Sequence, residues 1–177
     1  MAQIRTEDEV FSLTMKVIFL DIDGVLNCAH TPNPRNFPYI IDPVLLARFR
    51  KLVTDTGAQV VLSSTWRVDP IGLFAAKYYE VPFHDVCPDM PDAPRCEEMQ
   101  VWLRNHEDAT RYAVLDDEDD CLDELPLFQP SSKTGLTPEI AKGVEEFLAG
   151  RSDKDMRANA LTRFGQNIHA LFERDKS

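Results

Sequence analysis

The sequence predicts an α/β protein whose mostly parallel β-sheet is covered by helices on both faces. Short apolar runs alternate along the chain with segments whose apolar residues recur at helical spacing. The apolar runs are nearly continuous, which is typical of strands buried on both faces of a parallel sheet. Polar residues directly follow three of these runs, and in such sheets ligands bind beyond the carboxyl ends of the strands.

The first predicted strand covers residues 17–20 and runs directly into Asp21. A helix is predicted between Pro43, which favours the first turn of a helix, and Gly57, which favours its end. The apolar side chains of this helix recur at helical spacing, namely Leu45, Phe49, Leu52 and Val53. A second strand is predicted in the apolar run AQVVLSS at 58–64.

The middle of the chain continues the alternation of helices and strands. The segment IGLFAAKYY at 71–79 is predicted to be helical, and VPFHDV at 81–86 to contain a short strand. The segment RCEEMQVWLRNH at 95–106 has the pattern of a helix. The next strand is predicted in RYAVLDD at 111–117, and it ends in acidic residues.

The last predicted elements are a weak strand and two helices. ELPLFQ at 124–129 is the strand candidate, and Thr137 and Pro138 have the side chains that favour the start of a helix. The apolar stripe of this helix consists of Ile140, Val144, Phe147 and Leu148, and Gly150 ends it. Further apolar residues at helical spacing predict a C-terminal docking helix or a dimer contact, namely Leu161, Phe164, Ile168 and Leu171.

Length and composition predict one soluble domain. The 177 residues suffice for a single core, which we expect at 15–150, with extensions at 1–14 and 151–177. No apolar run approaches the length of a membrane span, and an acidic N-terminal segment is unlike a signal peptide, so we expect a cytoplasmic protein without membrane contact. The formal net charge of −11 disfavours tight nonspecific binding of nucleic acid.

The cysteines and histidines do not predict a disulfide framework or a zinc site. The four cysteines lack a CxxC pair or regular spacing, so we expect reduced thiols. The four histidines lack the spacing of metal ligands.

The candidate site lies at three predicted strand ends. The polar residues there are Asp21 and Asp23, Ser63 and Ser64, and Asp116 and Asp117. Taken singly, such residues most often cap helices, form turns or lie in a solvated charged face. Their joint placement favours a site, because the carboxyl ends of parallel strands meet at one edge of the sheet.

These residue types suit phosphoryl transfer. Asp21, at the end of a rigid strand, can attack phosphorus as a carboxylate nucleophile. Asp23 can protonate the leaving oxygen and later activate water. Gly24 lets the backbone turn sharply near a ligand, and a serine hydroxyl can hold phosphoryl oxygens. Clustered carboxylates need a cation, and all-oxygen ligation suits Mg²⁺.

Three of these stretches resemble a known superfamily. FLDIDGVLN closely resembles motif I of the haloacid dehalogenase (HAD) superfamily of phosphatases, VVLSSTWR is similar to motif II, and YAVLDD to motif IV. The run from about 16 to 148 resembles the HAD domain of Swiss Army Knife RNA repair proteins, and SSTWR and KTGLTPE support that likeness. The resemblance implies a HAD-like Rossmannoid three-layer fold. Its five-stranded, mostly parallel sheet has the motif I strand at its centre and no large cap domain.

The resemblance also implies roles for individual residues. Asp21 becomes the nucleophile and Asp23 the general acid and base, while Ser63 takes the motif II role with Ser64 as the alternative. Mg²⁺ is then bound by Asp116, a carboxylate oxygen of Asp21 and the backbone carbonyl of Asp23. Asp117 then supports the residues that bind the metal.

The third motif departs from the family pattern. The family has a lysine at the start of the helix before the motif IV strand, and this chain has Arg95 there. Arginine can clamp a phosphoryl group with two hydrogen bonds but is not equivalent to lysine. Lys77 is the weaker candidate for this role. The alternative for Arg95 is that it is only a solvent-exposed residue of its helix.

Three further residues are candidates for contact with the substrate. Trp66 is either a core residue or a platform on which a base stacks. Arg67 is predicted to meet a distal phosphate of the substrate. Asn27 either stabilises a turn or contacts substrate.

The resemblance implies a Mg²⁺-dependent phosphomonoester hydrolase with an aspartyl-phosphate intermediate. About 35 residues separate Asn27 from Ser63, too few for a cap domain, so the open site can admit a nucleic-acid end or a nucleotide. The acidic composition keeps a small-molecule phosphatase as the alternative. A receiver-like phosphoacceptor module fits less well. Receiver modules have their acid pair at the first strand and their phosphoacceptor on a middle strand, whereas here the DxD pair comes first and the DD pair late.

Overall fold

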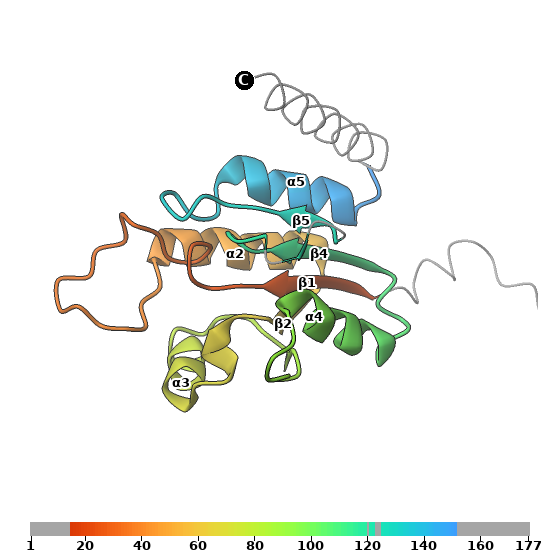
Figure 1. Cartoon of the computed structure of the whole chain (residues 1–177). Coiled ribbons are helices and arrows are strands. Elements are labelled where there is room, and N and C mark those ends of the chain that lie inside the picture. Colours follow the sequence, from red (N-terminus) through yellow and green to blue (C-terminus); the bar gives the residue numbers. More distant parts are fainter. Residues whose placement is uncertain (1–14, 120, 123–124, 152–177) are drawn as a thin grey trace, which may run out of the picture.

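A five-stranded parallel sheet with the strand order β3-β2-β1-β4-β5 forms the middle of the structure (Figure 1). The computed structural model of the chain describes residues 15–119, 121–122 and 125–151. The strands are β1 (Lys16–Leu20), β2 (Gln59–Leu62), β3 (Asp85–Val86), β4 (Arg111–Leu115) and β5 (Leu127–Phe128). Every neighbouring pair of strands is parallel, which confirms the predicted sheet with the first strand at its centre.

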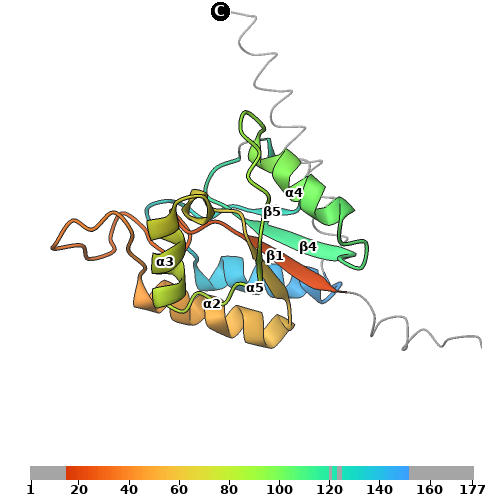
Figure 2. The same ribbon diagram turned by 90° about the horizontal axis from the view of Figure 1, so that it is seen from below.

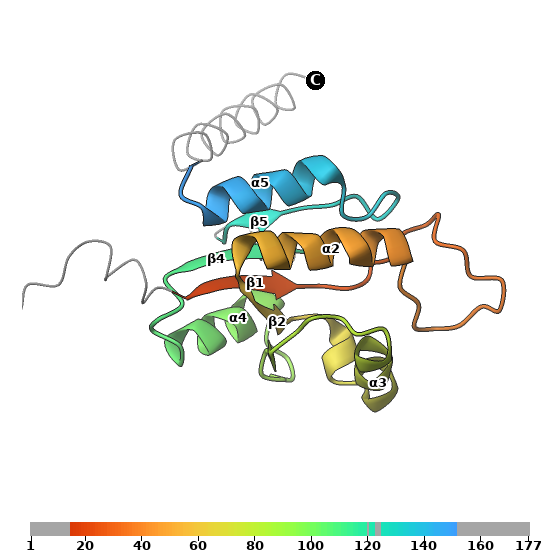
Figure 3. The ribbon, with the colours of Figure 1, turned by 180° about the vertical axis from the view of Figure 1, so that it is seen from behind.

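Helices cover both faces of the sheet and complete the expected three layers. On one face, α2 (Pro43–Thr56) and α5 (Pro138–Leu148) lie side by side (Figure 3). The opposite face is covered by α4 (Arg95–Arg104), as Figure 2 shows. A short 3-10 helix, η1 (Thr65–Arg67), and α3 (Pro70–Tyr78) follow β2 beyond the carboxyl ends of the strands.

The central strand β1 has no polar alternation because both of its faces are buried. Ile18 and Leu20 belong to the core cluster formed with α2 and α5. Val17 and Phe19 belong to the second cluster, which contains Met99 and Trp102 of α4. Successive side chains of a strand point to opposite faces, so the residue after Leu20 points toward α4.

The helix boundaries follow local capping residues, which include the predicted Gly57 and Thr137. The side chain of Asp42 accepts two backbone N–H groups at the start of α2, where Pro43 is the first residue. Gly57 ends this helix with φ 64°, a left-handed conformation that favours glycine. Thr137 caps α5 in the same way as Asp42 caps α2. Short local patterns therefore fix where both helices of this face begin.

No large cap domain is present among the described residues. The connection from β1 to α2 is a loop with turns, and the stretch from β2 to α4 contains only η1, α3 and β3. The predicted strands at 58–64 and 111–117 end earlier than expected, at Leu62 and Leu115. The polar residues that follow are thus outside the strands and belong to the loops at the carboxyl edge.

One pair of cysteines corrects the expectation of reduced thiols. Cys96, near the start of α4, forms a disulfide with Cys121, 25 residues later, and their Cα atoms lie 6.0 Å apart. Cys28 and Cys87 are free thiols. Sequence spacing could not predict this bridge, because the fold brings the start of α4 beside the loop after β4.

The predicted C-terminal helix at 151–177, with its possible dimer contact, and the extension at 1–14 lie almost entirely outside the described residues, which end at Arg151. The division of the chain into these parts therefore stays a prediction. Within the described part of the chain, no helix has the length and apolar character that crossing a membrane requires.

Candidate active site

Strand register brings three predicted residues into one row across the sheet. Leu20 of β1 pairs with Leu62 of β2 and with Leu115 of β4. The pairing extends past the strand ends, because the backbone N–H of Asp21 donates to the Leu115 carbonyl and that of Ser63 to the Leu20 carbonyl, each at 2.9 Å. The residues that follow these three leucines form the row, namely Asp21, Ser63 and Asp116.

This row faces α4. The residues two positions earlier in each strand pack in the core cluster beneath α4, namely Phe19, Val61 and Val114. Residues two apart on a strand share a face, so the row continues toward the start of α4. Asp21 is 4% exposed and Asp116 is fully buried, which places two carboxylates in a site with little solvent.

Burial and mutual repulsion raise the pKa of Asp21. Loss of solvation is the largest cause, the Asp116 charge adds to it, and the Arg95 guanidinium opposes both, so that the pKa rises to about 7. Burial and the neighbouring Asp116 charge also raise the pKa of Asp117. A cation bound among these groups would favour their ionised forms.

Three carboxylates could hold a divalent metal ion. Asp21, Asp116 and Asp117 each offer an oxygen, and these oxygens all lie within 4.8 Å of one another. An all-oxygen donor set of this kind suits Mg²⁺. Gly24, with φ 70°, leaves the room that the Asp117 carboxylate occupies, since a side chain at residue 24 would collide with that group. Gly24 thus shapes the acidic cluster.

Arg95 is the basic residue that reaches the acids. It is the first residue of α4, and its Nη1 donates to Asp116 Oδ2 and lies 3.5 Å from Asp21 Oδ1. Lys77 is exposed on α3 and has no contact with these acids that the described structure records. Of the two candidates for the third motif, the fold therefore brings only Arg95 to the site.

Asp23 lies at the turn after β1 and is oriented by two donors. The indole Nε1 of Trp66 donates to Asp23 Oδ2 at 2.8 Å, and Asn27 Nδ2 donates to Asp23 Oδ1 at 2.7 Å. Asn27 Oδ1 also accepts the backbone N–H of Gly24 at 3.1 Å, so Asn27 stabilises the turn as well. Each oxygen of the exposed Asp23 carboxylate has a fixed partner.

The position of Trp66 favours the core reading over stacking on a base. Trp66 is 2% exposed, and its ring packs edge-on against Tyr39 with centroids 4.9 Å apart. A buried ring offers no face to a base. Sequence spacing does not indicate the hydrogen bond from Trp66 to Asp23, because 43 residues separate the two.

The two serines of the second motif have different surroundings. The Ser64 hydroxyl hydrogen-bonds the Asp21 carboxylate and favours its ionised form, and it also accepts the backbone N–H of Trp66 at 3.4 Å. Ser63 Oγ is buried and has no hydrogen-bond partner within the described residues. Ser64, the alternative in the sequence analysis, is the serine that contacts Asp21.

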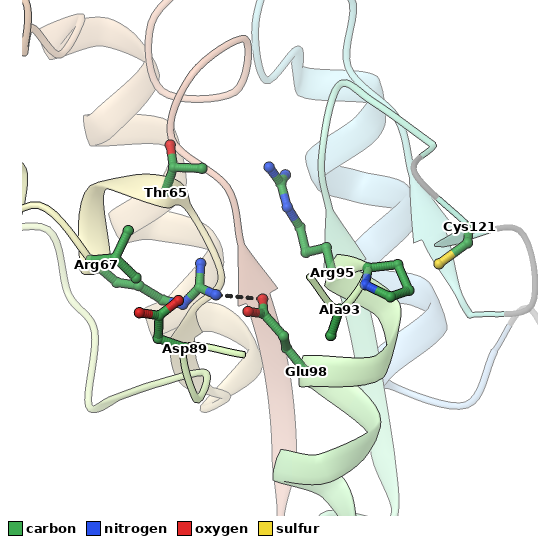
Figure 4. Close-up of a pocket in the computed structure, with 9 residues that line it drawn as sticks. Thr65, Arg67, Asp89, Ala93, Arg95, Glu98 and Cys121 are labelled. Carbon is green, nitrogen blue, oxygen red and sulfur yellow. Dashed lines mark hydrogen bonds and ion pairs between the residues drawn. The ribbon is translucent and has the colours of Figure 1, made fainter. Parts of the chain in front are cut away.

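Arg67 is placed differently from its predicted role. It is buried, and its guanidinium donates to the carbonyls of Ser64 at 3.0 Å and Cys87 at 3.1 Å, among others. It also forms a buried ion pair with Glu98 of α4, drawn as a dashed line in Figure 4. Glu98 Oε1 in turn accepts the Met90 N–H at 3.1 Å. The geometry therefore does not support a contact between Arg67 and a distal phosphate.

A cavity of about 600 Å³ opens beside Arg95 (Figure 4). Its walls come from η1 with Val68, from the loop that leads into α4, from the first turns of α4, and from Cys121. Its lining includes the charged residues Arg67, Asp89, Arg95 and Glu98, and Figure 4 shows Asp89 and Arg95 on opposite sides. This cavity could not be predicted from the sequence, because no shared pattern connects the segments that form its walls.

Comparison with known proteins agrees with the geometry. The family model described as the HAD domain in Swiss Army Knife RNA repair proteins matches residues 17–141. The match includes the three strand ends that carry the acidic cluster and the two serines, as well as Arg95. No curated protein matches the chain.

Proposed function

Because the chain belongs to the family of HAD domains found in Swiss Army Knife RNA repair proteins, we propose that it is a Mg²⁺-dependent phosphatase acting on phosphomonoesters. Membership makes it a HAD-type protein, and hydrolysis of phosphate esters is the activity that its residues support best. The observation that carries the proposal is the row of Asp21 and Asp116 beside Arg95, with Asp23 held one turn away.

In the first step Asp21 attacks phosphorus. A bond forms between a carboxylate oxygen of Asp21 and phosphorus, and the ester bond from phosphorus to the leaving oxygen breaks. Asp23 gives its proton to that oxygen, so the product leaves as an alcohol. The hydrogen bonds from Trp66 and Asn27 orient the Asp23 carboxyl for this transfer.

In the second step water hydrolyses the phosphoaspartate. Asp23, now ionised, takes a proton from the attacking water, the bond between phosphorus and the Asp21 oxygen breaks, and inorganic phosphate leaves. Arg95 offsets negative charge beside Asp21 throughout, since its guanidinium lies 3.5 Å from the nucleophile. The buried Ser63 hydroxyl has no other partner among the described residues and can donate to a phosphoryl oxygen.

The acidic cluster fits Mg²⁺. Asp21, Asp116 and Asp117, together with the backbone carbonyl of Asp23, would hold the ion, because the three carboxylates supply oxygens at short mutual distance. When bound, Mg²⁺ would neutralise charge on the phosphoryl oxygens. The raised pKa of Asp21 supports this assignment, since a nearby cation would keep the nucleophile ionised at neutral pH.

The substrate we propose is a phosphorylated nucleic-acid end or a nucleotide. The family description names RNA repair proteins, and the described residues contain no large domain above the site. A small-molecule phosphatase is the second candidate, favoured by the net charge of −11, which opposes extensive contact with a polyanion.

Phosphate release from a substrate panel tests the proposal. The panel contains nucleotides, oligonucleotides phosphorylated at the 3′ or the 5′ end, and sugar phosphates, each with Mg²⁺ and with EDTA. We expect release that needs Mg²⁺ and is abolished in Asp21→Asn, because an amide cannot form the acyl phosphate. Equal activity of the wild type in EDTA, or near wild-type activity of Asp21→Asn, would contradict it.

A further inference from the structure

An exposed aromatic groove lies beside the candidate active site. It has a volume of about 210 Å³, and its walls are residues 37–39 of the loop after β1 and one side of α3 with Tyr79. Phe37, Phe74 and Tyr78 contribute to it and are 52%, 68% and 73% exposed. Large aromatic side chains at such exposure, gathered in one concave place, mark a binding surface. We call this surface the aromatic groove.

The aromatic groove is linked to Asp23 through the buried ring of Trp66. Tyr39, one of its lining residues, packs on Trp66, and Trp66 donates to Asp23 at 2.8 Å. The Tyr39 hydroxyl also donates to Asp69 Oδ2 at 2.5 Å, and Asp69 caps α3. Both walls are therefore tied together, and only one ring separates the groove from the proposed acid and base.

The loop wall is fixed before any ligand binds. The side chain of Asn33 accepts the backbone N–H of Phe37 at 2.9 Å and donates to its carbonyl at 2.8 Å. The two exposed rings on α3, Phe74 and Tyr78, are stacked with an angle of 23° between their planes. Preformed walls reduce the entropy that a ligand must lose on binding.

The two segments that carry the walls of the aromatic groove have a charge opposite to that of the whole chain. Residues 28–41 and 70–79, which carry its walls, contain no Asp or Glu, although the chain has a formal net charge of −11. Each segment carries one exposed cation, Arg35 or Lys77. Three carboxylates border these segments: Asp69, which is hydrogen-bonded to Tyr39 and caps α3, Asp42, which caps α2, and the exposed Glu80, which pairs with Arg50. An anionic ligand is thus repelled less here than elsewhere.

We propose that the aromatic groove binds the nucleobase next to the phosphorylated end of a single-stranded nucleic acid, an inference that rests on the proposed phosphatase function. Bases stack on aromatic side chains without regard to sequence, and the two cations suit the adjoining backbone phosphates. The small volume suits a single planar ring system. The base then anchors the substrate while its terminal phosphate reaches Asp21.

Direct binding tests the aromatic groove independently of catalysis. Fluorescence anisotropy compares an unphosphorylated oligothymidylate with an abasic oligomer of equal length and charge, at one fixed salt concentration. We expect the wild type to bind the abasic oligomer about tenfold more weakly. Phe74→Ala and Tyr78→Ala should each weaken binding of the oligothymidylate by about tenfold and leave the abasic oligomer unaffected. Val44→Ala, an exposed apolar residue outside the groove, is the matched control.

Kinetics then separates this inference from the proposed function. Phe74→Ala should raise KM for a phosphorylated oligonucleotide about tenfold and leave kcat/KM for glycerol 2-phosphate unchanged. If no substrate is hydrolysed but the anisotropy result holds, the proposed function fails and the base-binding groove stands. Equal binding of both oligomers, or unchanged binding in both variants, overturns the inference. So does a change of oligomeric state in both variants without loss of binding, which would assign the groove to self-association.

Discussion

Asp21 carries two opposing demands at the scale of a single residue. The proposed role as nucleophile requires an ionised Asp21, yet burial beside Asp116 disfavours that charge and raises the pKa of Asp21 to about 7. Arg95 and the Ser64 hydroxyl oppose that rise without cancelling it. Without metal, an ionised Asp21 therefore destabilises the folded protein. Such a destabilised carboxylate is consistent with the proposed binding of a cation at this site.

The first prediction concerns the stability of Asp21→Asn without metal. Because the folded-state pKa of Asp21 is raised from 3.8 to about 7, the folded protein binds more protons than the unfolded chain between these values. Stability from this group is thus greatest below about pH 4 and falls as pH rises to about 7. In EDTA at pH 8, the free energy of unfolding of Asp21→Asn should exceed that of the wild type by roughly 2–4 kcal/mol. Any hydrogen bonds that the amide cannot make reduce this difference.

Urea unfolding at pH 4, 6 and 8 measures this difference. The advantage of Asp21→Asn should shrink toward pH 4, where the wild-type carboxyl is protonated in the folded state and partly protonated in the unfolded chain. Asp55→Asn, at an exposed position on α2, is the control and should show no such trend. If the wild type gains stability relative to Asp21→Asn between pH 4 and pH 8, the assignment is refuted.

The second prediction concerns the two donors that hold Asp23. Trp66→Phe keeps a large buried ring but removes the N–H that donates to Asp23. A typical intramolecular hydrogen bond contributes about 0.5–1.5 kcal/mol, so loss of this orienting contact should lower kcat on an alkyl phosphate by up to about tenfold. The loss should be smaller on an aryl phosphate, because a good leaving group needs less protonation.

Asp23→Asn provides the matched comparison. It should lower turnover on the alkyl phosphate by about 10²–10⁴-fold and retain relatively more activity on the aryl phosphate. Steady-state rates of both variants on both substrates measure the pattern. Equal losses on the two substrates would make Asp23 a structural or metal-site residue and leave Asp21 as the nucleophile.

At the scale of elements, local patterns predicted the helices and the three long strands. Caps such as Asp42 and Thr137 act within a few residues, and buried strands such as β1 are recognisable from their apolar runs. Their ends also located the acidic cluster, because parallel strands share one carboxyl edge. Patterns of this kind are encoded in neighbouring residues and can be read without the fold.

Pairings between distant side chains could not be predicted in this way. Arg67 meets Glu98, 31 residues away, and Trp66 meets Asp23, 43 residues away. Periodicity shows which face a residue occupies but not which side chain lies opposite. Consequently the sequence leaves Trp66 open between the core and a substrate platform and points Arg67 toward a phosphate, whereas packing gives both residues partners within the protein.

The third prediction concerns the disulfide that joins α4 to the loop after β4. Cys96 directly follows Arg95, and Cys121 lies a few residues after the acids that follow β4, so the bridge ties both sides of the site together. Closing a loop of 25 residues restricts the unfolded chain, and its loss should lower the free energy of unfolding by about 3 kcal/mol.

Chemical unfolding with and without a dithiol reductant measures this loss. The double variant Cys96→Ser/Cys121→Ser should have the stability of the reduced wild type and should not respond to the reductant. Cys28→Ser removes a free thiol and should behave like the wild type in both conditions. No change in wild-type stability on full reduction, verified by thiol titration, would argue against a stabilising bridge.

At the scale of the whole molecule, charge is distributed unevenly. The chain has a formal net charge of −11, three acids gather at the carboxyl edge of the sheet, and the segments around the aromatic groove carry no acid. A protein with this charge gains stability from any added salt through screening. Specific binding of Mg²⁺ must therefore be separated from this general effect.

The last prediction is that Mg²⁺ stabilises the folded protein through Asp116. A ligand that binds only the folded state stabilises it by about 2.7 kcal/mol at 100 times its Kd, which corresponds to a rise in Tm of roughly 5–10 °C for a domain of this size. Thermal unfolding in MgCl₂ and in NaCl of equal ionic strength isolates the specific part. We expect this extra rise in the wild type and its loss in Asp116→Asn, because a neutral amide is a weaker ligand than a carboxylate. Asp119→Asn removes the same charge outside the cluster and should keep the rise, so it controls for net charge. An equal Mg²⁺ effect in the wild type and Asp116→Asn would show that the ion acts by screening and would remove the acidic cluster as the metal site.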